Sequence, residues 1–254
     1  MTKRTVPHCP VCQGAPVPLG AVDFNKNCEE ARGRRLPPAD RLVEYVICRG
    51  CGFAWAPEFA AWTPADFQRD IYNAGYGDVD PDHLEVRPRT NAETLLATFP
   101  APHRPARHLD YGGGAGRLGE LLREAGWDST SWDPFFAGPG QVEPEGRYPL
   151  ITCFEVFEHV PDVAQLAGCL DRLLAPDGLI LASTLVSDGQ VLPGRPLTWW
   201  YAAPRNGHVS LFSARSLGLL AARQGWATAS FSADIHLFWR GEFPAWARHL
   251  LKAA

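Results

Sequence analysis

The sequence predicts an α/β fold, with a mostly parallel sheet, an antiparallel last strand and a small N-terminal domain in front. From residue 106 onward, short apolar runs alternate with stretches of helical periodicity, which is typical of a parallel sheet covered by helices. A glycine-rich turn joins the first of these runs to the first helix. Before residue 61 the dominant features are instead two Cys-x-x-Cys pairs and proline-rich connections.

Length and composition limit the number of domains and the classes of partner. A chain of 254 residues, 46% of them hydrophobic, can hold one ordinary domain and an appendage. We expect a cysteine-bearing domain at 1–60, a connecting segment at 61–105 and the α/β domain at 106–254. The net charge of −4 excludes a global attraction to nucleic acid or membranes. No apolar run approaches the roughly 20 residues of a membrane span, and the N-terminus lacks a signal-peptide core, so we expect the cytoplasm.

The N-terminal cysteines form two knuckles, CPVCQG and CRGCGF, which contain Cys9, Cys12, Cys48 and Cys51. Thiols are reduced in the cytoplasm, and two such knuckles can complete a tetrahedral zinc site. The gap between them is 35 residues (48 − 12 − 1), longer than in compact zinc ribbons. A redox pair or four unmetallated thiols is the alternative. Because four cysteines leave no open position on the metal, we expect the zinc to serve folding.

The connecting segment reads as short helices around an aromatic, acidic loop. Tyr72, Tyr76 and His83 could close over a ligand there, although such aromatic side chains more often pack against a core.

The first strand–turn–helix segment of the α/β domain is ARHLDYGGGAGRLGELLREAGW. It predicts a strand that ends at Asp110, a glycine turn over 112–116 and an amphipathic helix that Gly126 ends. Glycines at a strand-to-helix turn allow tight backbone geometry and close approach of a ligand. The next strand, DSTSWD, ends at Asp133, which follows Asp110 by 23 residues (133 − 110) and can bind a ribose diol.

Two cofactors compete for this turn. Residues 114–119 satisfy the dinucleotide pattern G-x-G-x-x-G, which by itself is a weak signal for NAD. Asp110 directly precedes the turn, where a carboxylate would repel a pyrophosphate but attract a sulfonium cofactor that carries an ammonium group. The charge therefore favours S-adenosylmethionine.

Across about residues 91–240 the sequence resembles the class I S-adenosylmethionine-dependent methyltransferases, which have a Rossmann-like sheet. Four segments carry the resemblance in family order: HLDYGGGAGRLG, GWDSTSWDPF, YPLITCFEVFEHVPD and LLAPDGLILAST. The resemblance implies methyl transfer from S-adenosylmethionine, with Asp133 on the ribose. It also implies cofactor contacts from the acid before the turn, three turn glycines and the end of the fourth strand, namely Asp110, Gly112, Gly114, Gly116 and Phe154.

The sequence departs from this family at the third strand. Only 16 residues (150 − 133 − 1) separate Asp133 from the strand LITCF, so we expect that strand to be shortened or lost. Pro149 also stands where relatives commonly carry an aspartate. The resemblance therefore leaves adenine recognition open.

The segment FEVFEHV places Glu155, Glu158 and His159 at positions i, i+3 and i+4. With the distant His208, it resembles the metal-dependent O-methyltransferases of plant small-RNA 3′-end modification and of ubiquinone biosynthesis, in which two glutamates and one or two histidines bind a divalent ion. Such a site suits Mg²⁺, Mn²⁺, Fe²⁺ or Co²⁺ and two substrate oxygens. In a metal-free alternative, His159 or His208 takes the acceptor's proton and Glu158 is also part of the catalytic site. In a structural alternative, Glu158 stabilises a helix N-terminus.

The remaining segments complete the sheet and add an insertion. Residues 186–207 form an insertion long enough for a lid, in which Trp199, Trp200 and Tyr201 could stack on a substrate or pack on the core. We expect a helix over 213–225, two antiparallel strands within 226–243 and a short helix over 245–253.

These features predict an O-methyltransferase for a small, oxygen-rich acceptor such as a sugar, a glycan unit or a natural-product intermediate. Zinc-ribbon methyltransferases that resemble this N-terminus include deoxysugar C-methyltransferases, so C-methylation is an alternative. A second alternative is an RNA methyltransferase, in which Arg32, Arg34 and Arg35 would contact phosphate. A third is a non-catalytic module that binds partners.

Overall fold

The computed structural model describes residues 8–136 and 143–252. The chain divides into two compact units, which are described separately below. Unit 1 comprises Met1–Asp80, Phe157–Leu166 and Leu185–Leu220, and unit 2 comprises Pro81–Val156, Ala167–Thr184 and Ala221–Ala254. Both units are therefore discontinuous in sequence, whereas the expected domains at 1–60, 61–105 and 106–254 are each one continuous stretch.

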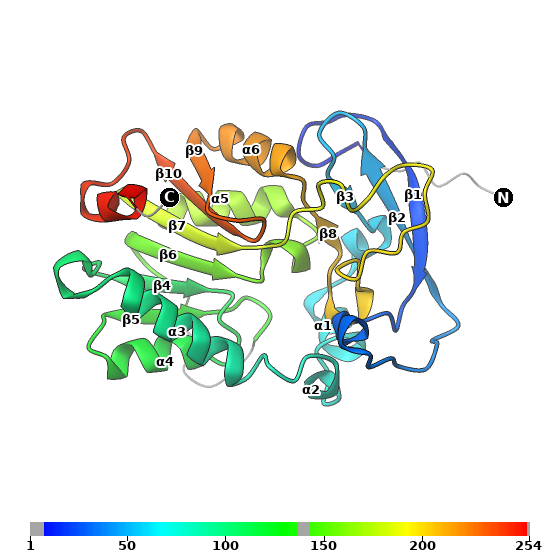
Figure 1. The fold of residues 1–254 in the computed structure, drawn as a ribbon, viewed down its shortest axis with the longest axis horizontal. Coiled ribbons are helices and arrows are strands. Elements are labelled where there is room, and N and C mark those ends of the chain that lie inside the picture. The colour runs from blue at the N-terminus through cyan, green and yellow to red at the C-terminus, as the bar shows by residue number, and fades with distance from the viewer. Residues whose placement is uncertain (1–7, 137–142, 253–254) are drawn as a thin grey trace. The chain divides into compact units, whose positions relative to one another are not determined.

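Unit 2 is built on a six-stranded sheet (Figure 1). Its strands are, in spatial order, β5 (Ser129–Trp132), β4 (His108–Tyr111), β6 (Tyr148–Phe154), β7 (Leu174–Ser183), β10 (Ile235–Arg240) and β9 (Trp226–Ser230). The first four are mutually parallel, and β10 runs antiparallel to both β7 and β9. The expected α/β class, with a mostly parallel sheet and an antiparallel last strand, is confirmed.

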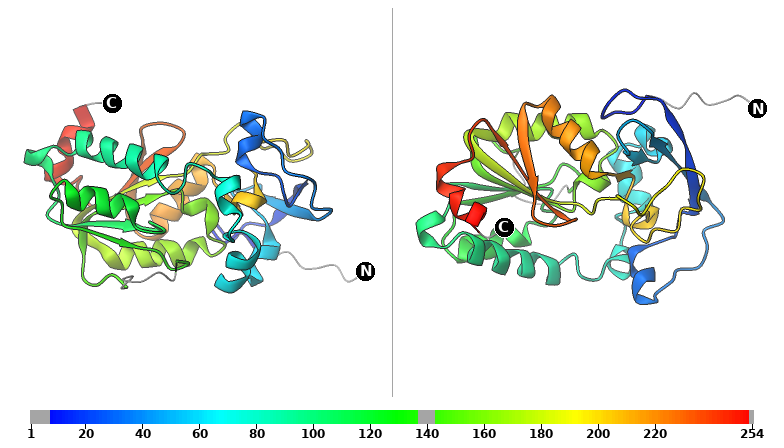
Figure 2. Two further views of the ribbon diagram at one scale, coloured as in Figure 1. Left: turned by 90° about the horizontal axis from the view of Figure 1, so that it is seen from below. Right: turned by 45° about the horizontal axis from the view of Figure 1, so that its top comes forward.

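Helices cover this sheet on both faces, with α3 and α4 on one side and α5 on the other (Figure 2). The helical segments are η3 (Ala101–His103), α3 (Val86–Thr98), α4 (Arg117–Glu124), α5 (Val163–Leu173), α6 (Ala214–Arg223) and η6 (Ala245–Lys252); the division between the units falls within α5 and α6. Leu95 of α3, Leu122 of α4 and Leu150 of β6 are fully buried in one hydrophobic cluster. Burial of such side chains stabilises the fold by about 1.5–3 kcal/mol each.

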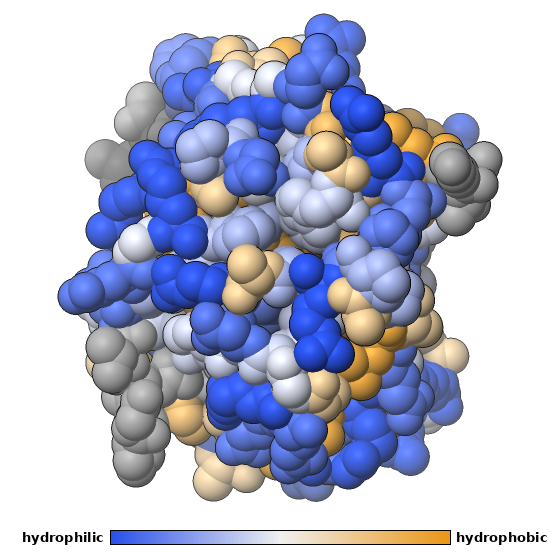
Figure 3. All heavy atoms as spheres, turned by 90° about the vertical axis from the view of Figure 1, so that its left-hand side faces the viewer, coloured by the Kyte–Doolittle hydropathy of each residue, from blue (hydrophilic) through white to orange (hydrophobic). Residues whose placement is uncertain are grey.

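On the face of the molecule in Figure 3, hydrophilic side chains predominate and apolar ones gather in small groups. Throughout the described part of the chain, every helix is too short or too polar to cross a bilayer.

The expected loss of the third strand concerns the segment that follows β5. Within the described residues, β5 is an edge strand of the sheet. Residues 137–142 lie outside them, so the shortened third strand stays a prediction.

Unit 1 contains a four-stranded antiparallel sheet. Its order is β1 (Pro16–Asp23), β2 (Leu42–Cys48), β3 (Ala54–Trp55) and β8 (Ser210–Leu211). Because β8 follows the insertion at 186–207, the N-terminal sheet is completed by chain that the sequence assigned to the α/β domain.

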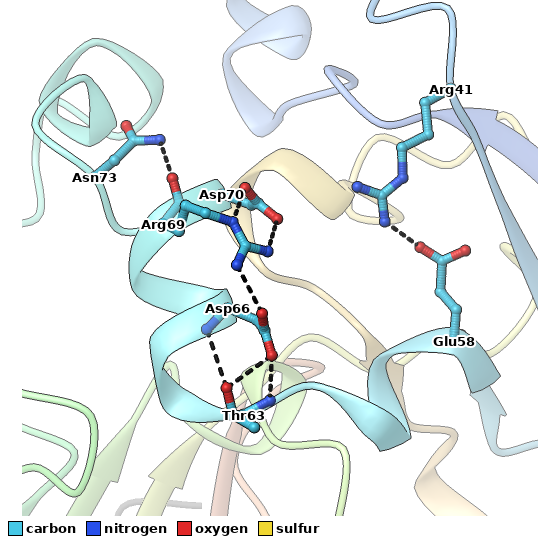
Figure 4. A network of polar contacts seen from close by, with 7 residues as sticks. All are labelled: Arg41, Glu58, Thr63, Asp66, Arg69, Asp70 and Asn73. Carbon is cyan, nitrogen blue, oxygen red and sulfur yellow. Dashed lines mark hydrogen bonds and ion pairs between the residues drawn. The ribbon is translucent and has the colours of Figure 1, made fainter.

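Unit 1 also contains short helices, which are η1 (Cys28–Arg32), η2 (Pro57–Ala61), α1 (Pro64–Asp70), α2 (Tyr76–Val79), η4 (Phe157–His159) and η5 (Pro204–Asn206). Thr63 and Asp66 form a capping box at the start of α1, and Pro64 occupies its first position (Figure 4). At the other end, the Asn73 side-chain amide donates to the Arg69 carbonyl at 3.0 Å. These contacts fix both ends of α1 and thereby the chain that leads into Tyr72.

Candidate functional site

The glycine turn between β4 and α4 is shaped by close contacts within unit 2. Gly112, Gly114 and Gly116 all have positive φ, which side chains other than glycine adopt at a cost. A Cβ on Gly113 would lie 2.1 Å from an Asp110 carboxylate oxygen, so only glycine fits there. A Cβ on Gly114 would meet no other atom within 4 Å. The turn is therefore tightly packed at Gly113 and open at Gly114, which suits a ligand bound against the backbone.

Asp110 is buried at the base of this turn, in a polar network. Its carboxylate accepts hydrogen bonds from the Ser131 hydroxyl at 2.7 Å and the Thr152 hydroxyl at 3.2 Å. Burial raises the pKa of Asp110 to about 6 despite these hydrogen bonds.

His108 extends the network across the sheet. Its Nε2 lies 2.9 Å from the Thr152 hydroxyl and its Nδ1 lies 2.8 Å from the Ser129 hydroxyl. Since the Thr152 proton points to Asp110, Thr152 must accept from Nε2–H, and Ser129 then donates to Nδ1. Burial lowers the pKa of His108 to about 3, so the ring is neutral. We did not predict this network, although a histidine within an apolar strand was a signal.

The strand that was predicted to end at Asp133 ends one residue earlier, because β5 is Ser129–Trp132 and Asp133 follows it directly. Its carboxylate accepts hydrogen bonds from the backbone N–H of Gly114 at 3.0 Å and of Phe135 at 2.8 Å. Burial raises its pKa. These contacts fix the carboxylate beside the turn, and a carboxylate oxygen can accept hydrogen bonds from the hydroxyls of a ribose.

Within unit 2, Phe154 ends β6 and Glu155 follows it directly. Phe154 packs against the hydrophobic cluster. Glu155 has a φ of 53°, and its carboxylate accepts a hydrogen bond from the Ser183 hydroxyl at 2.9 Å. Glu155 therefore engages the end of β7, and it is not part of the side-chain cluster formed by the other three predicted ligands.

That cluster, in unit 1, consists of Glu158, His159 and His208, and we call it the acid–imidazole cluster. A carboxylate oxygen and one nitrogen of each ring all lie within 4.8 Å of one another. The two imidazole rings are 4.9 Å apart between centroids. Glu158 is fully buried and His208 nearly so. One carboxylate and two imidazoles form a donor set that suits a divalent transition metal or Mg²⁺ with open positions.

The hydrogen bonds of His208 identify its tautomer. Nδ1 lies 2.8 Å from the Tyr201 carbonyl, which can only accept, so Nδ1 carries the proton. The thiol of Cys28 lies 3.8 Å from the same nitrogen. With Nδ1 engaged in this way, Nε2 is the ring nitrogen that could serve as a metal ligand or general base. The Tyr45 hydroxyl donates to the His208 carbonyl at 2.6 Å and fixes the backbone.

Tyrosine hydroxyls contact the other two members of the cluster. Tyr201 donates to the Glu158 carboxylate, and the Tyr72 hydroxyl lies 3.1 Å from His159 Nδ1. A Cβ on Gly207, whose φ is 91°, would lie 2.8 Å from the Tyr72 hydroxyl and 2.9 Å from His159 Nδ1. Glycine at 207 is therefore required for this contact. Sequence reasoning singled out both tyrosines for their rings but missed these hydroxyl contacts.

The four predicted zinc ligands also come together in unit 1. Cys9 Sγ lies 3.6 Å from Cys51 Sγ, and Cys12 Sγ lies 3.4 Å from Cys48 Sγ. All four sulfurs lie within 4.8 Å of one another. This spacing is compatible with tetrahedral zinc, in which bonds of about 2.3 Å place the sulfurs about 3.8 Å apart. A hydrogen bond from Cys51 lowers the pKa of Cys9 to about 5. The donor set fits Zn²⁺.

Comparison with known proteins adds family information. A family model described as a methyltransferase domain matches residues 83–230. The ubiquinone biosynthesis O-methyltransferase of Pasteurella multocida (strain Pm70) is 42% identical over 50 residues, which are 20% of this chain and 19% of the relative. The enzyme of the same name from Bordetella avium (strain 197N) is 31% identical over 102 residues, with 31% of this chain and 42% of the relative covered. The chain thus spans less than half the length of these curated relatives.

Solved structures resemble the fold. An O-methyltransferase family protein from Burkholderia thailandensis matches with a TM-score of 0.52 and 17% identity, over 72% of this chain and 64% of that one. The 1,6-didemethyltoxoflavin-N1-methyltransferase of the same organism, solved with 1,6-didemethyltoxoflavin and S-adenosylhomocysteine, matches with a TM-score of 0.50 and 20% identity, over 80% and 96%. At these identities the likeness concerns the fold alone.

Proposed function

This chain belongs to the methyltransferase family whose domain model matches residues 83–230, and from that premise we propose that it transfers a methyl group from S-adenosylmethionine to a hydroxyl oxygen of a small, oxygen-rich acceptor. The observation that carries the choice of oxygen is the acid–imidazole cluster, because a carboxylate and two imidazoles can hold a divalent ion that binds acceptor oxygens. The names of the ubiquinone O-methyltransferase relatives support the same choice.

In this proposal unit 2 binds the methyl donor. S-adenosylmethionine supplies an electrophilic methyl group on a cationic sulfonium. The open side of the glycine turn at Gly114 admits the methionine end against the backbone, and the Asp110 carboxylate at the base of the turn favours its positive charge. Asp133, fixed by two backbone N–H groups, accepts the ribose hydroxyls. Phe154 at the end of β6 would border the same ligand.

The acid–imidazole cluster presents the acceptor. A divalent ion there would orient two acceptor oxygens and lower the pKa of the hydroxyl that is methylated. Glu158, His159 and the Nε2 atom of His208 are its protein ligands in the proposal, and Glu155 stands outside this set. The acceptor oxygen bonds to the methyl carbon as the sulfur–methyl bond breaks, and the hydroxyl proton passes to solvent or to an unligated base. Only three residues separate Phe154 from Glu158, so the donor and acceptor sites are close in sequence.

The N-terminal cysteines hold a structural zinc ion in this proposal. A Cβ on Gly14 would lie 2.9 Å from Cys48 Sγ and 3.3 Å from Cys12 Sγ, so the knuckle is already closed around the sulfurs. Four thiolates leave no open position for a substrate, which assigns the zinc to folding.

The test is to incubate the protein with methyl-labelled S-adenosylmethionine and separate small-molecule and RNA fractions of a host extract. We expect label on a small molecule, as a base-stable methyl ether. We also expect Glu158→Gln to lose most turnover, while Glu145→Gln, at an exposed acid of unit 2, keeps it. Label on RNA or on carbon would overturn the acceptor class. Absence of S-adenosylhomocysteine binding in calorimetry would overturn methyl transfer itself.

A further inference from the structure

We propose that Tyr201, from the insertion at 186–207, is a positioning residue that holds two members of the acid–imidazole cluster in a metal-ligating arrangement. The inference rests on the divalent site of the proposed function and deepens it, because it names the residue that prepares that site before an ion binds. Metal affinity commonly depends on groups that contact the ligands without touching the metal.

Tyr201 contacts both ligands with different parts of the same residue. Its hydroxyl donates to the Glu158 carboxylate and accepts from the backbone N–H of Leu185 at 3.3 Å. Its carbonyl accepts from Nδ1–H of His208 at 2.8 Å. The hydroxyl therefore selects the orientation of the carboxylate, and the carbonyl selects the tautomer that leaves Nε2 as a ligand. The Tyr201 and His208 rings also pack with centroids 4.1 Å apart.

The position of Tyr201 is itself fixed by the N-terminal segment of unit 1. The Lys26 ammonium donates to the carbonyls of Trp199 at 2.6 Å and Ala202 at 2.8 Å, one on each side of Tyr201. Tyr201 is only 3% exposed. A tyrosine held at both flanks and buried can impose its own geometry on the two ligands instead of following theirs.

A role in core packing alone would explain the burial but would make the hydroxyl dispensable. Tyr201→Phe separates the two roles, because it keeps the ring and the carbonyl and removes only the hydroxyl. Tyr148→Phe is the matched control, since Tyr148 is as buried as Tyr201 but begins β6 in unit 2, whereas the acid–imidazole cluster belongs to unit 1. Thermal unfolding of both variants checks that they remain folded.

The primary measurement is Mn²⁺ affinity, from the electron paramagnetic resonance signal of the free ion. Mn²⁺ prefers oxygen and nitrogen ligands, so the four cysteines should not compete for it. We expect Tyr201→Phe to bind about 10- to 100-fold more weakly and Tyr148→Phe to match the wild type. We also expect excess Mn²⁺ to restore the kcat of Tyr201→Phe. Equal affinity in Tyr201→Phe and the wild type would overturn the inference and leave the divalent site intact. No Mn²⁺ binding by the wild type would instead overturn the divalent site.

A second measurement does not depend on the variant. The ¹⁵N chemical shifts of the His208 ring in the metal-free wild-type protein report its tautomer. We expect the proton on Nδ1 and an unprotonated Nε2. An Nδ1 without a proton would overturn the inference, because the Tyr201 carbonyl would then not be setting the tautomer.

Discussion

The backbone N–H of Gly114 donates a hydrogen bond of 3.0 Å to the carboxylate of Asp133. This contact joins the turn that would hold the methionine end of the donor to the acid that would hold its ribose. Since both groups lie within unit 2, donor binding can be tested separately from the acceptor and the metal.

Asp133→Ala should weaken S-adenosylhomocysteine binding about 10- to 100-fold, because a hydrogen bond to a charged group contributes about 1.5–3 kcal/mol. Isothermal titration calorimetry measures the change. Asp128→Ala, at an exposed acid just before β5, is the control and should bind normally. Asp133→Asn, which can still accept from Gly114, should lose less than the alanine variant. Unchanged affinity in Asp133→Ala would remove the ribose assignment.

Gly113→Ala should destabilise the protein and abolish donor binding. The added Cβ would lie 2.1 Å from an Asp110 oxygen and 2.2 Å from the Ser131 hydroxyl, both held in the network beneath the turn. Overpacking of this kind typically costs about 1–3 kcal/mol. Gly168→Ala in α5, where a Cβ meets nothing within 4 Å, should instead gain up to about 1 kcal/mol. Urea unfolding of the two variants gives the comparison, and equal stabilities would contradict the close packing.

The parts of the fold that the sequence predicted have local signals. The turn after β4 is marked by its glycines, and the strands within 226–243 by apolar runs of strand length. The two-residue strand β8 has no such signal. It exists because Ala54 of β3 pairs with Leu211, a contact across more than half of the chain. The continuous domain boundaries that we predicted could not include this pairing, because periodicity reports only neighbours in sequence.

In the candidate site, too, the sequence predicted the residues that have a local signal or a family resemblance and missed the contacts between distant residues. Glu158 and His159 are adjacent in sequence, and the resemblance supplied His208. The role of Tyr201 depends on a hydroxyl and a carbonyl that face two different ligands, which no spacing in the sequence indicates. The link from His108 to Asp110 was equally hidden, because it passes through Thr152 on a neighbouring strand.

The stability of the protein should depend on pH through Asp110. Burial raises the pKa of Asp110 to about 6, above the unfolded value of about 3.9. Between these values the folded state binds more protons than the unfolded state, so the contribution of Asp110 to stability falls as pH rises from about 4 to 6. Neighbouring Asp133 raises this pKa further, whereas His108 is neutral in the same range.

Asp110→Asn should therefore gain stability relative to the wild type as pH rises, by up to about 3 kcal/mol at neutral pH. Urea unfolding of both proteins at about pH 4 and pH 8 measures this difference. Donor binding should change in the opposite direction, since the cationic donor favours the ionised wild-type carboxylate. A stability difference that stays constant over this range would show that Asp110 does not titrate there.

Cys48→Ser should remove the structural zinc and destabilise the protein, because the site loses one of four thiolate ligands. Metal analysis should find one zinc per wild-type chain and less in the variant, with a lower unfolding temperature. Cys169→Ser is the matched control, since this half-buried thiol lies outside the four-cysteine cluster, and it should keep the zinc. Gly14→Ala should also weaken zinc binding, because its Cβ would lie 2.9 Å from Cys48 Sγ. A wild-type protein that is free of zinc but equally stable would contradict the metal assignment and favour unmetallated thiols.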